Sequence, residues 1–152
     1  MRNVMPKRAS LHMAAFEFNL SDPPSEPRQR ELWLQHAIGF ILFQDVRDYA
    51  LQQIDASLKD NEKPAVIKAI NDAVYGLMMV LDGVTGSLSN ESRRVNLRVL
   101  AELVDVDTDE VVESLDLMDG DGMCMGYHGW IENDFGDILP FTADPKSEED
   151  RQ

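Results

Sequence analysis

The sequence has a single cysteine, Cys124, among 152 residues. One cysteine excludes an intramolecular disulfide, and this scarcity is typical of a reducing compartment. Long apolar runs are also missing: the longest, AIGFILF at 37–43, is far shorter than the roughly 20 residues that cross a bilayer. We therefore expect a cytoplasmic protein and no membrane partner.

Basic residues are scarce in the last third of the chain. Residues 95–152 hold three lysines and arginines against sixteen aspartates and glutamates, and they carry nearly all of the net charge of −14. Such a surface repels nucleic-acid phosphates and anionic lipids, so neither is an expected partner. It attracts and steers a basic protein instead. A plain solvated surface is the alternative interpretation of the same charge.

Two stretches have the three- and four-residue apolar spacing of amphipathic helices. The first is predicted to begin at Ser25, an N-cap residue followed by Pro27, and to continue to about residue 58. The second covers about 64–81 and ends before Gly83, a predicted C′ glycine. Because few residues connect the two helices, we expect them to pack as an antiparallel helical hairpin.

Prolines and charge predict the boundaries of the domain. The motif SDPPSEP interrupts the chain before the first helix, so residues 1–24 are expected to form an extended or flexible arm. Residues 142–152 are polar and acidic, and are expected to form a disordered tail. Residues 25–141 would then form a single domain. The apolar segment 37–43 makes a homodimer through the first helix a further hypothesis.

After residue 90 the apolar period changes from 3.6 to 2. Residues 95–103 and 111–117 both alternate, and DVDTDE between them is typical of a turn. This pattern predicts a β-hairpin with one face on the helices. Leu100 and Val104 interrupt its polar side, so a helix at 93–104 is the alternative. The expected fold class is α+β, with an N-terminal helical hairpin packed on a small antiparallel β-sheet or hairpin.

The stretch DLMDGDGMCMGYHGWIENDFGD, residues 116–137, concentrates five glycines and five aspartates. Its DGDG does not complete a calcium loop, because methionine, cysteine and tryptophan occupy later ligand and glycine positions. Cys124 and His128 lie four residues apart, and they are the candidate ligands of a metal or the centre of a small metal- or cysteine-dependent enzyme. Acidic surroundings disfavour a thiolate. We therefore expect no cofactor and a non-enzymatic protein, with that enzyme as the alternative.

The same stretch also predicts a binding surface. Its Asp-Gly pairs favour tight turns, with MCMGYHGW returning as a strand or loop. Aromatic rings among acidic residues are typical of a surface that binds a basic protein. The candidate partner-binding residues are Asp119, Asp121, Tyr127, Trp130, Glu132 and Asp134. Burial of Tyr127 and Trp130 in the core is the alternative.

Two motifs carry a resemblance to known proteins. AVYGLMMVLDGVTG at the end of the second helix, followed by a hairpin and LMDGDGMCMGYHGW, resembles small acidic bacterial proteins of the toxin–immunity type. The likeness covers about residues 64–137. It implies a cytosolic inhibitor that occludes a toxin, with an acidic surface against a basic cleft.

Overall fold

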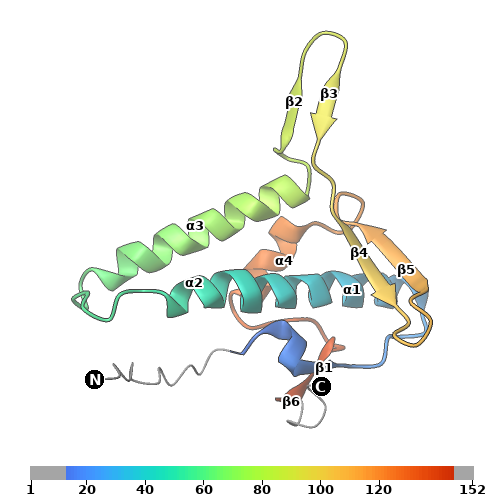
Figure 1. Cartoon of the computed structure of the whole chain (residues 1–152), viewed down its shortest axis with the longest axis horizontal. Coiled ribbons are helices and arrows are strands. Elements are labelled where there is room, and N and C mark those ends of the chain that lie inside the picture. The colour runs from blue at the N-terminus through green and yellow to red at the C-terminus, as the bar shows by residue number, and fades with distance from the viewer. Residues whose placement is uncertain (1–12, 146–152) are drawn as a thin grey trace, which may run out of the picture.

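The computed structural model describes residues 13–145. It confirms the α+β class: a run of helical elements is followed by a run of short antiparallel strands, and one more helix and strand complete the described chain (Figure 1). The helical elements are η1 (Ala15–Glu17), α1 (Pro27–Leu42), the π-helical η2 (Phe43–Asp48), α2 (Tyr49–Gln52), α3 (Lys63–Leu81) and α4 (Met123–Trp130). The strands are β1 (Phe18–Leu20), β2 (Ser87–Ser89), β3 (Arg94–Asn96), β4 (Leu100–Val104), β5 (Val111–Asp116) and β6 (Phe141–Pro145).

The first helix starts one residue later than the sequence predicts. Its N-cap is Glu26, not Ser25, and the Glu26 carboxylate accepts hydrogen bonds from the backbone N–H groups of Arg28 (3.0 Å) and Gln29 (2.7 Å). These are two of the donors that have no partner inside a helix. Pro27 lies in the first turn, as predicted, and it occupies the first helical position.

The second helix lies where the sequence predicts it. Gly83 follows the end of α3 with a φ of +73°, the left-handed conformation of a C′ glycine. By length and composition alone, α3 is apolar enough to cross a membrane, a test that core helices also pass. Its inward residues Val74, Met78 and Leu81 are buried in the protein core.

A third helix, α4, lies between the two long ones. Both α1 and α3 pack mainly on α4. The predicted first helix is divided into α1, η2 and α2, and α3 meets it mainly at η2 and α2 (Figure 1). The predicted helical hairpin is therefore not confirmed as a direct packing unit. The sequence prediction of a strand or loop for MCMGYHGW is corrected by α4, in which Met123, Tyr127 and Trp130 are buried at helical spacing.

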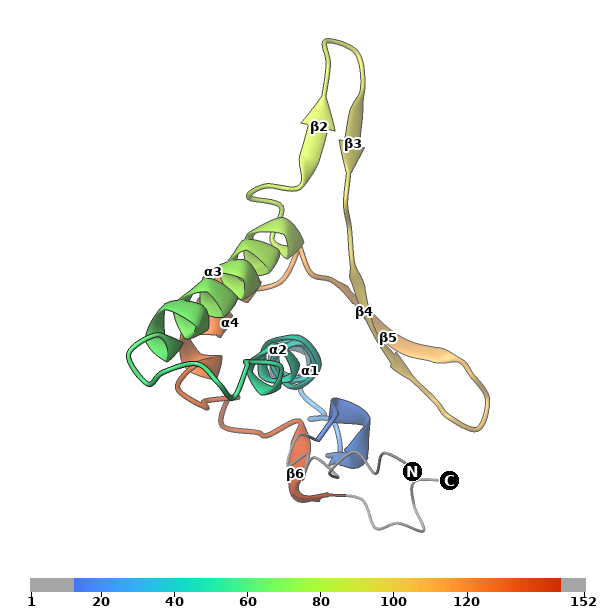
Figure 2. The same ribbon diagram turned by 60° about the vertical axis from the view of Figure 1, so that its left-hand side comes forward.

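Residues 13–145 form three two-stranded sheets: β1 with β6, β2 with β3, and β4 with β5. The β4–β5 hairpin is the one predicted from alternation, and residues 93–104 are extended, not helical. The predicted strand is divided, however. Its first part, β3, pairs with β2, a strand that the sequence analysis did not predict. Figure 2 shows the two hairpins projecting from the body in different directions.

The two ends of the described chain pair with each other. Phe18 lies opposite Pro145, and Leu20 lies opposite Phe141. The expected N-terminal arm is therefore a strand over part of its length, and residues 142–145, which were expected to belong to a disordered tail, continue β6. The remainder of both segments, 1–12 and 146–152, lies outside the described residues.

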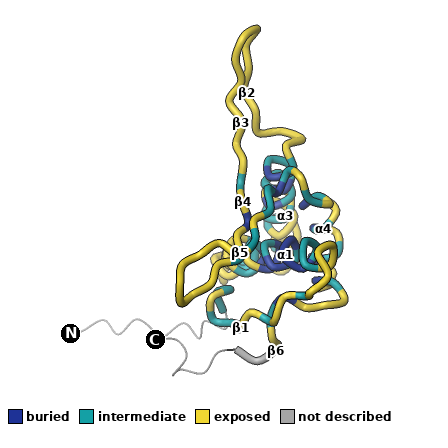
Figure 3. Tube along the Cα trace, turned by 90° about the vertical axis from the view of Figure 1, so that its right-hand side faces the viewer, coloured by how far each residue is buried: buried dark blue, intermediate teal, exposed yellow. Residues whose placement is uncertain are grey.

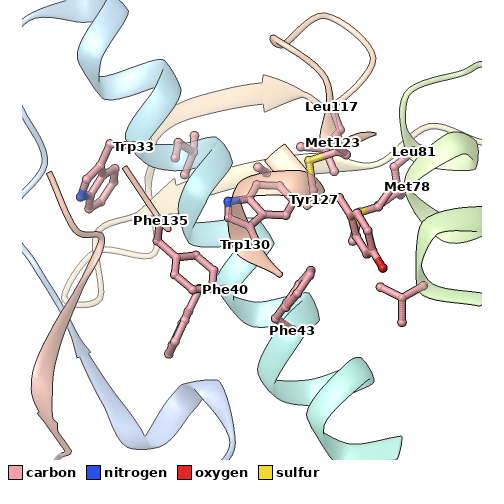
Figure 4. Packing of buried hydrophobic residues seen from close by; sticks show 13 residues of the cluster. Trp33, Phe40, Phe43, Met78, Leu81, Leu117, Met123, Tyr127, Trp130 and Phe135 are labelled. Carbon is pink, nitrogen blue, oxygen red and sulfur yellow. The ribbon is translucent and has the colours of Figure 1, made fainter. Parts of the chain in front are cut away.

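The core is built around Trp130, whose side chain is 1% exposed. Figure 4 shows the indole ring among aromatic and apolar side chains from α1, α3 and α4. Phe43 meets it edge-on with 6.0 Å between ring centroids, and Phe135 stacks on it at 6.5 Å. Gly39 on α1 and Gly126 on α4 have no side chain to keep the ring away: a Cβ at either position would lie 2.3 Å from a ring carbon. The ring therefore fixes the separation of α1 and α4.

Candidate functional site

The four acidic residues predicted to bind a partner are all exposed, but two of them are already paired. Asp121 accepts from the Arg28 guanidinium at 2.5 Å, and Asp119 lies 3.8 Å from the Arg98 guanidinium. Asp134 accepts a hydrogen bond from the backbone N–H of Gly136, which is a turn contact. These residues border α4 without converging on one concave site.

The two predicted aromatic anchors are not on the surface. Trp130 and Tyr127 are 1% and 7% exposed, so burial in the core is the outcome for both. Tyr127 packs edge-on against Tyr75, and its hydroxyl donates to the backbone carbonyl of Asn71 at 3.3 Å. Neither ring is available to a partner in this conformation.

Cys124 and His128 lie on the same face of α4, near Tyr75. Burial and the adjacent Asp82 carboxylate raise the pKa of the Cys124 thiol, which opposes formation of a nucleophilic thiolate. His128 is exposed, and its ring lies 5.8 Å from the Tyr75 ring between centroids. Within residues 13–145 no three His, Cys, Asp or Glu side chains come together as a metal site. The pair therefore lacks both an activated thiol and a third ligand in the described chain.

Asp82 has a structural role in this region. Gly122, the N-cap of α4, has no side chain to cap the helix, and Asp82 from the end of α3 replaces it. Its two carboxylate oxygens accept from the backbone N–H groups of Met123 (2.5 Å) and Cys124 (2.8 Å). A carboxylate at a helix N-terminus also interacts favourably with the helix dipole. Asp82 thereby joins α3 to the start of α4.

We expect Asp82→Ala to lower the free energy of unfolding by about 1–2 kcal/mol, because two backbone donors lose their acceptor. Asp72→Ala is the matched control, since Asp72 is an exposed acid on the same helix that pairs only with Lys68. Its loss is expected to cost about 0.5 kcal/mol or less. Urea unfolding of the full chain measures both. Equal losses would contradict the capping role of Asp82.

A cavity of about 410 Å³ opens beside α4, between α1 and the segment that follows α4. The sequence analysis did not predict it, because its lining comes from two distant parts of the sequence: His36 lies on α1, far from the glycine-rich stretch. Its lining includes His36, Asp134 and Asp137, together with the apolar side chains of Leu32, Trp33, Met125 and Ile138. The spacing of Trp33 and His36 on one face of the first helix was the available signal.

The hydrogen bonding of His36 limits its chemistry. Its Nδ1 accepts from the indole N–H of Trp130 at 2.9 Å, so the neutral ring carries its proton on Nε2. Burial lowers the pKa of His36, while the carboxylates of Asp134 and Asp121 act in the opposite direction. His36 is therefore held as a neutral hydrogen-bond donor toward the cavity, and Nδ1 is not free to act as a general base. The lining contains no serine, threonine, cysteine or lysine.

His36 makes stability depend on pH. Because its folded-state pKa lies below the ordinary value of 6.5, its contribution is complete above that value and is lost as the pH falls below it. We expect His36→Gln to be less stable than the wild type at neutral pH, and the difference to shrink on acidification from about pH 7.5 to 5.5. His128→Gln, a change at an exposed ring, is the control. Thermal unfolding over this range is the measurement, and a difference that grows on acidification would contradict this role.

The densest group of exposed acids lies elsewhere, on the β4–β5 hairpin. Within 102–113 the chain has six acidic residues and no basic one, and residues 104–112 are all exposed. Exposed valines lie among the acids: Val104, Val106, Val111 and Val112, with Val106 90% exposed. The sequence analysis predicted a β-hairpin here, with DVDTDE as its turn, but did not identify it as a binding surface. Its valines, in a segment without basic residues, were the signal that could have identified it.

The body of the protein supports this hairpin from one face. Ala101 on β4 is buried, and Leu103 and Leu115 pack against the core. Arg30 on α1 forms an ion pair with Glu113 on β5. At the turn, the Asp105 carboxylate accepts from the backbone N–H groups of Asp107 (2.9 Å) and Thr108 (3.0 Å). The hairpin therefore presents a turn with a defined conformation.

Comparison with known proteins gives no relative from which a function could be transferred: no family model, no curated protein and no solved structure matches this chain.

Proposed function

We propose that this protein is a non-enzymatic acidic binding module for a basic protein, and that the β4–β5 hairpin is its contact surface. One observation carries the proposal: a projecting hairpin that combines exposed acids with exposed valines. Acids alone are well solvated and need no partner. Exposed valines in a cluster are unfavourable in water and are typical of a surface that is covered on binding.

The two kinds of side chain have different roles in this proposal. The net charge of −14 attracts a basic partner over a distance and increases the association rate. After contact, burial of Val106 and Val112 supplies free energy at about 25 cal/mol per Å² of apolar surface. Because the turn is already ordered by Asp105, little conformational entropy is lost on binding.

The proposal includes an immunity-type role in the cytoplasm. An inhibitor of this kind covers the active-site cleft of a basic toxin, and a projecting acidic hairpin has the shape and charge to enter such a cleft. The buried positions of Tyr127 and Trp130 exclude them from this contact surface. Of the residues predicted from the sequence, only the acids near α4 are exposed, and they lie outside the β4–β5 hairpin.

Affinity capture tests the proposal. The full chain is immobilised, exposed to a lysate of the source organism and eluted with rising salt. We expect a basic protein in a one-to-one complex that salt releases, because screening weakens interactions between exposed charges. Capture of nothing above the blank column would contradict the proposal. A captured protein without excess positive charge, held at high salt, would contradict it as well.

A further inference from the structure

The β2–β3 hairpin is an exposed arm whose side chains are not covered by the body of the protein. All residues of 83–98 are exposed, including every residue of both strands. Figure 3 shows the arm exposed along its length, in contrast to the buried centre of the body. It nevertheless has an ordered tip: the Asn90 side chain accepts from the backbone N–H groups of Ser92 (3.0 Å) and Arg93 (2.9 Å).

One face of the arm is apolar. Leu88 and Val95 are cross-strand partners, so their side chains lie on the same face, and Leu97 shares that face two residues further on. Leu88 is 78% exposed and Val95 is 71% exposed. An isolated two-stranded hairpin is only marginally stable in water, because it buries too little apolar surface. An apolar face on such an arm therefore indicates a surface that packs on another molecule.

The charge of the arm identifies the kind of surface that fits it. Within 83–99 there are three arginines and one glutamate, in a protein whose net charge is −14. Arg93 and Arg94 at the tip make no ion pair within the described chain. A basic partner would be repelled by them. The complementary surface is acidic and apolar, and the β4–β5 hairpin of another copy has both properties.

We propose that the arm docks on the β4–β5 hairpin of a second copy of this chain, and that the second copy's arm docks reciprocally. Leu88, Val95 and Leu97 would cover the exposed valines, while Arg93 at the tip would lie among the acids of the turn. Arg94 alternates with Val95, lies on the opposite face of the arm and contributes attraction over a longer distance. The short link between β3 and β4 favours a mutual exchange of arms, because it joins the arm directly to the β4–β5 hairpin within residues 94–104. Two copies related by a two-fold axis, with these segments antiparallel, therefore place each arm beside the other's hairpin.

This dimer differs from the one suggested by the sequence, which used the apolar segment 37–43. In the structure four residues of that segment, Ala37, Gly39, Phe40 and Phe43, are buried inside the monomer. The arm-exchanged dimer does not depend on the proposed basic partner, since it forms from one purified protein. If both proposals hold, the partner and the arm compete for the same hairpin.

Sedimentation velocity of the purified full chain tests this proposal. We expect a dimer at roughly 1–100 µM that dissociates as salt is raised. Leu88→Ser with Val95→Ser is expected to weaken it at least about tenfold, and Arg93→Glu with Arg94→Glu similarly. All four side chains are exposed, so circular dichroism should be unchanged. A wild-type monomer throughout this range overturns the proposal, as does a dimer that tolerates both double substitutions.

A charge exchange separates this dimer from an arm-to-arm dimer. Asp107→Lys with Glu110→Lys places two lysines at the turn in place of two of its acids. That variant alone should be monomeric, like Arg93→Glu with Arg94→Glu. When the two variants are mixed, both contacts become complementary and a heterodimer should form. An arm-to-arm dimer would instead persist in the hairpin variant on its own, because that variant keeps the wild-type arm. Failure of the mixture to associate therefore overturns the proposal.

Discussion

Replacing Gly39 by alanine is expected to lower the free energy of unfolding by about 3 kcal/mol or more, although alanine is the better helix former. The added methyl would lie 2.3–2.6 Å from three carbons of the Trp130 ring. The ring cannot move aside, because it is 1% exposed and is packed against Phe43 and Phe135. The helices α1 and α4 must therefore separate, which opens the core. Urea unfolding followed by circular dichroism measures the loss.

Gly76→Ala is the matched control for this prediction. Gly76 also lies inside a long helix, α3, but a Cβ there meets no atom within 4 Å. Helix propensity alone then applies, and the substitution is expected to stabilise the protein by about 0.5–1 kcal/mol. Opposite signs for the two variants would support the close approach of α1 and α4 at Trp130. The same sign for both would contradict this packing.

Neutralising the β4–β5 turn is expected to have the largest effect on partner binding. The variant Asp107→Asn, Asp109→Asn, Glu110→Gln keeps the size of each side chain and removes three negative charges. Asp109 has a φ of +57°, a conformation that asparagine tolerates well. We expect the dissociation constant for the captured basic protein to rise about 10- to 100-fold, mainly through slower association. Surface plasmon resonance at two salt concentrations measures the dissociation constant and the association rate constant.

The control variant removes three charges from exposed residues outside the β4–β5 hairpin. Asp22→Asn, Glu132→Gln and Asp137→Asn change exposed residues and leave the same net charge as the turn variant. Long-range attraction is then lowered equally, so a difference between the variants reports contact at the turn. A larger loss in the control variant would place the contact nearer the surface predicted from the sequence around Glu132.

The fold class could be predicted because its main signals are local. The apolar spacing of α3, its terminal Gly83 and the alternation in β4 and β5 depend on neighbouring residues, and each is confirmed. The helix α4 could not be predicted in the same way. Its glycines suggest turns, but Gly126 accommodates the Trp130 ring, and the helix start is capped by Asp82, about 40 residues away. Tertiary contacts decided the conformation of that segment.

The site was located only in part. Sequence reasoning placed the acidity in the last third of the chain, where the hairpin is, and it connected that acidity with Tyr127 and Trp130 because aromatic residues are common in interfaces. Those two residues lie four and seven positions after Met123. This helical spacing places all three on the face of α4 that packs in the core. The exposed valines of the β4–β5 hairpin were less conspicuous, since valine is also the typical residue of a buried strand.

Site-specific photo-crosslinking tests the central claim most directly, because it reports where the basic partner touches the protein. A benzophenone side chain is introduced at Val106 in one variant and at Met125 in the other, both highly exposed, at 90% and 73%. Val106 lies at the β4–β5 turn, and Met125 lies on α4 within the stretch favoured by the sequence. We predict a cross-link to the partner from Val106 and none from Met125. A cross-link from Met125 alone would contradict the assignment of the hairpin as the binding surface.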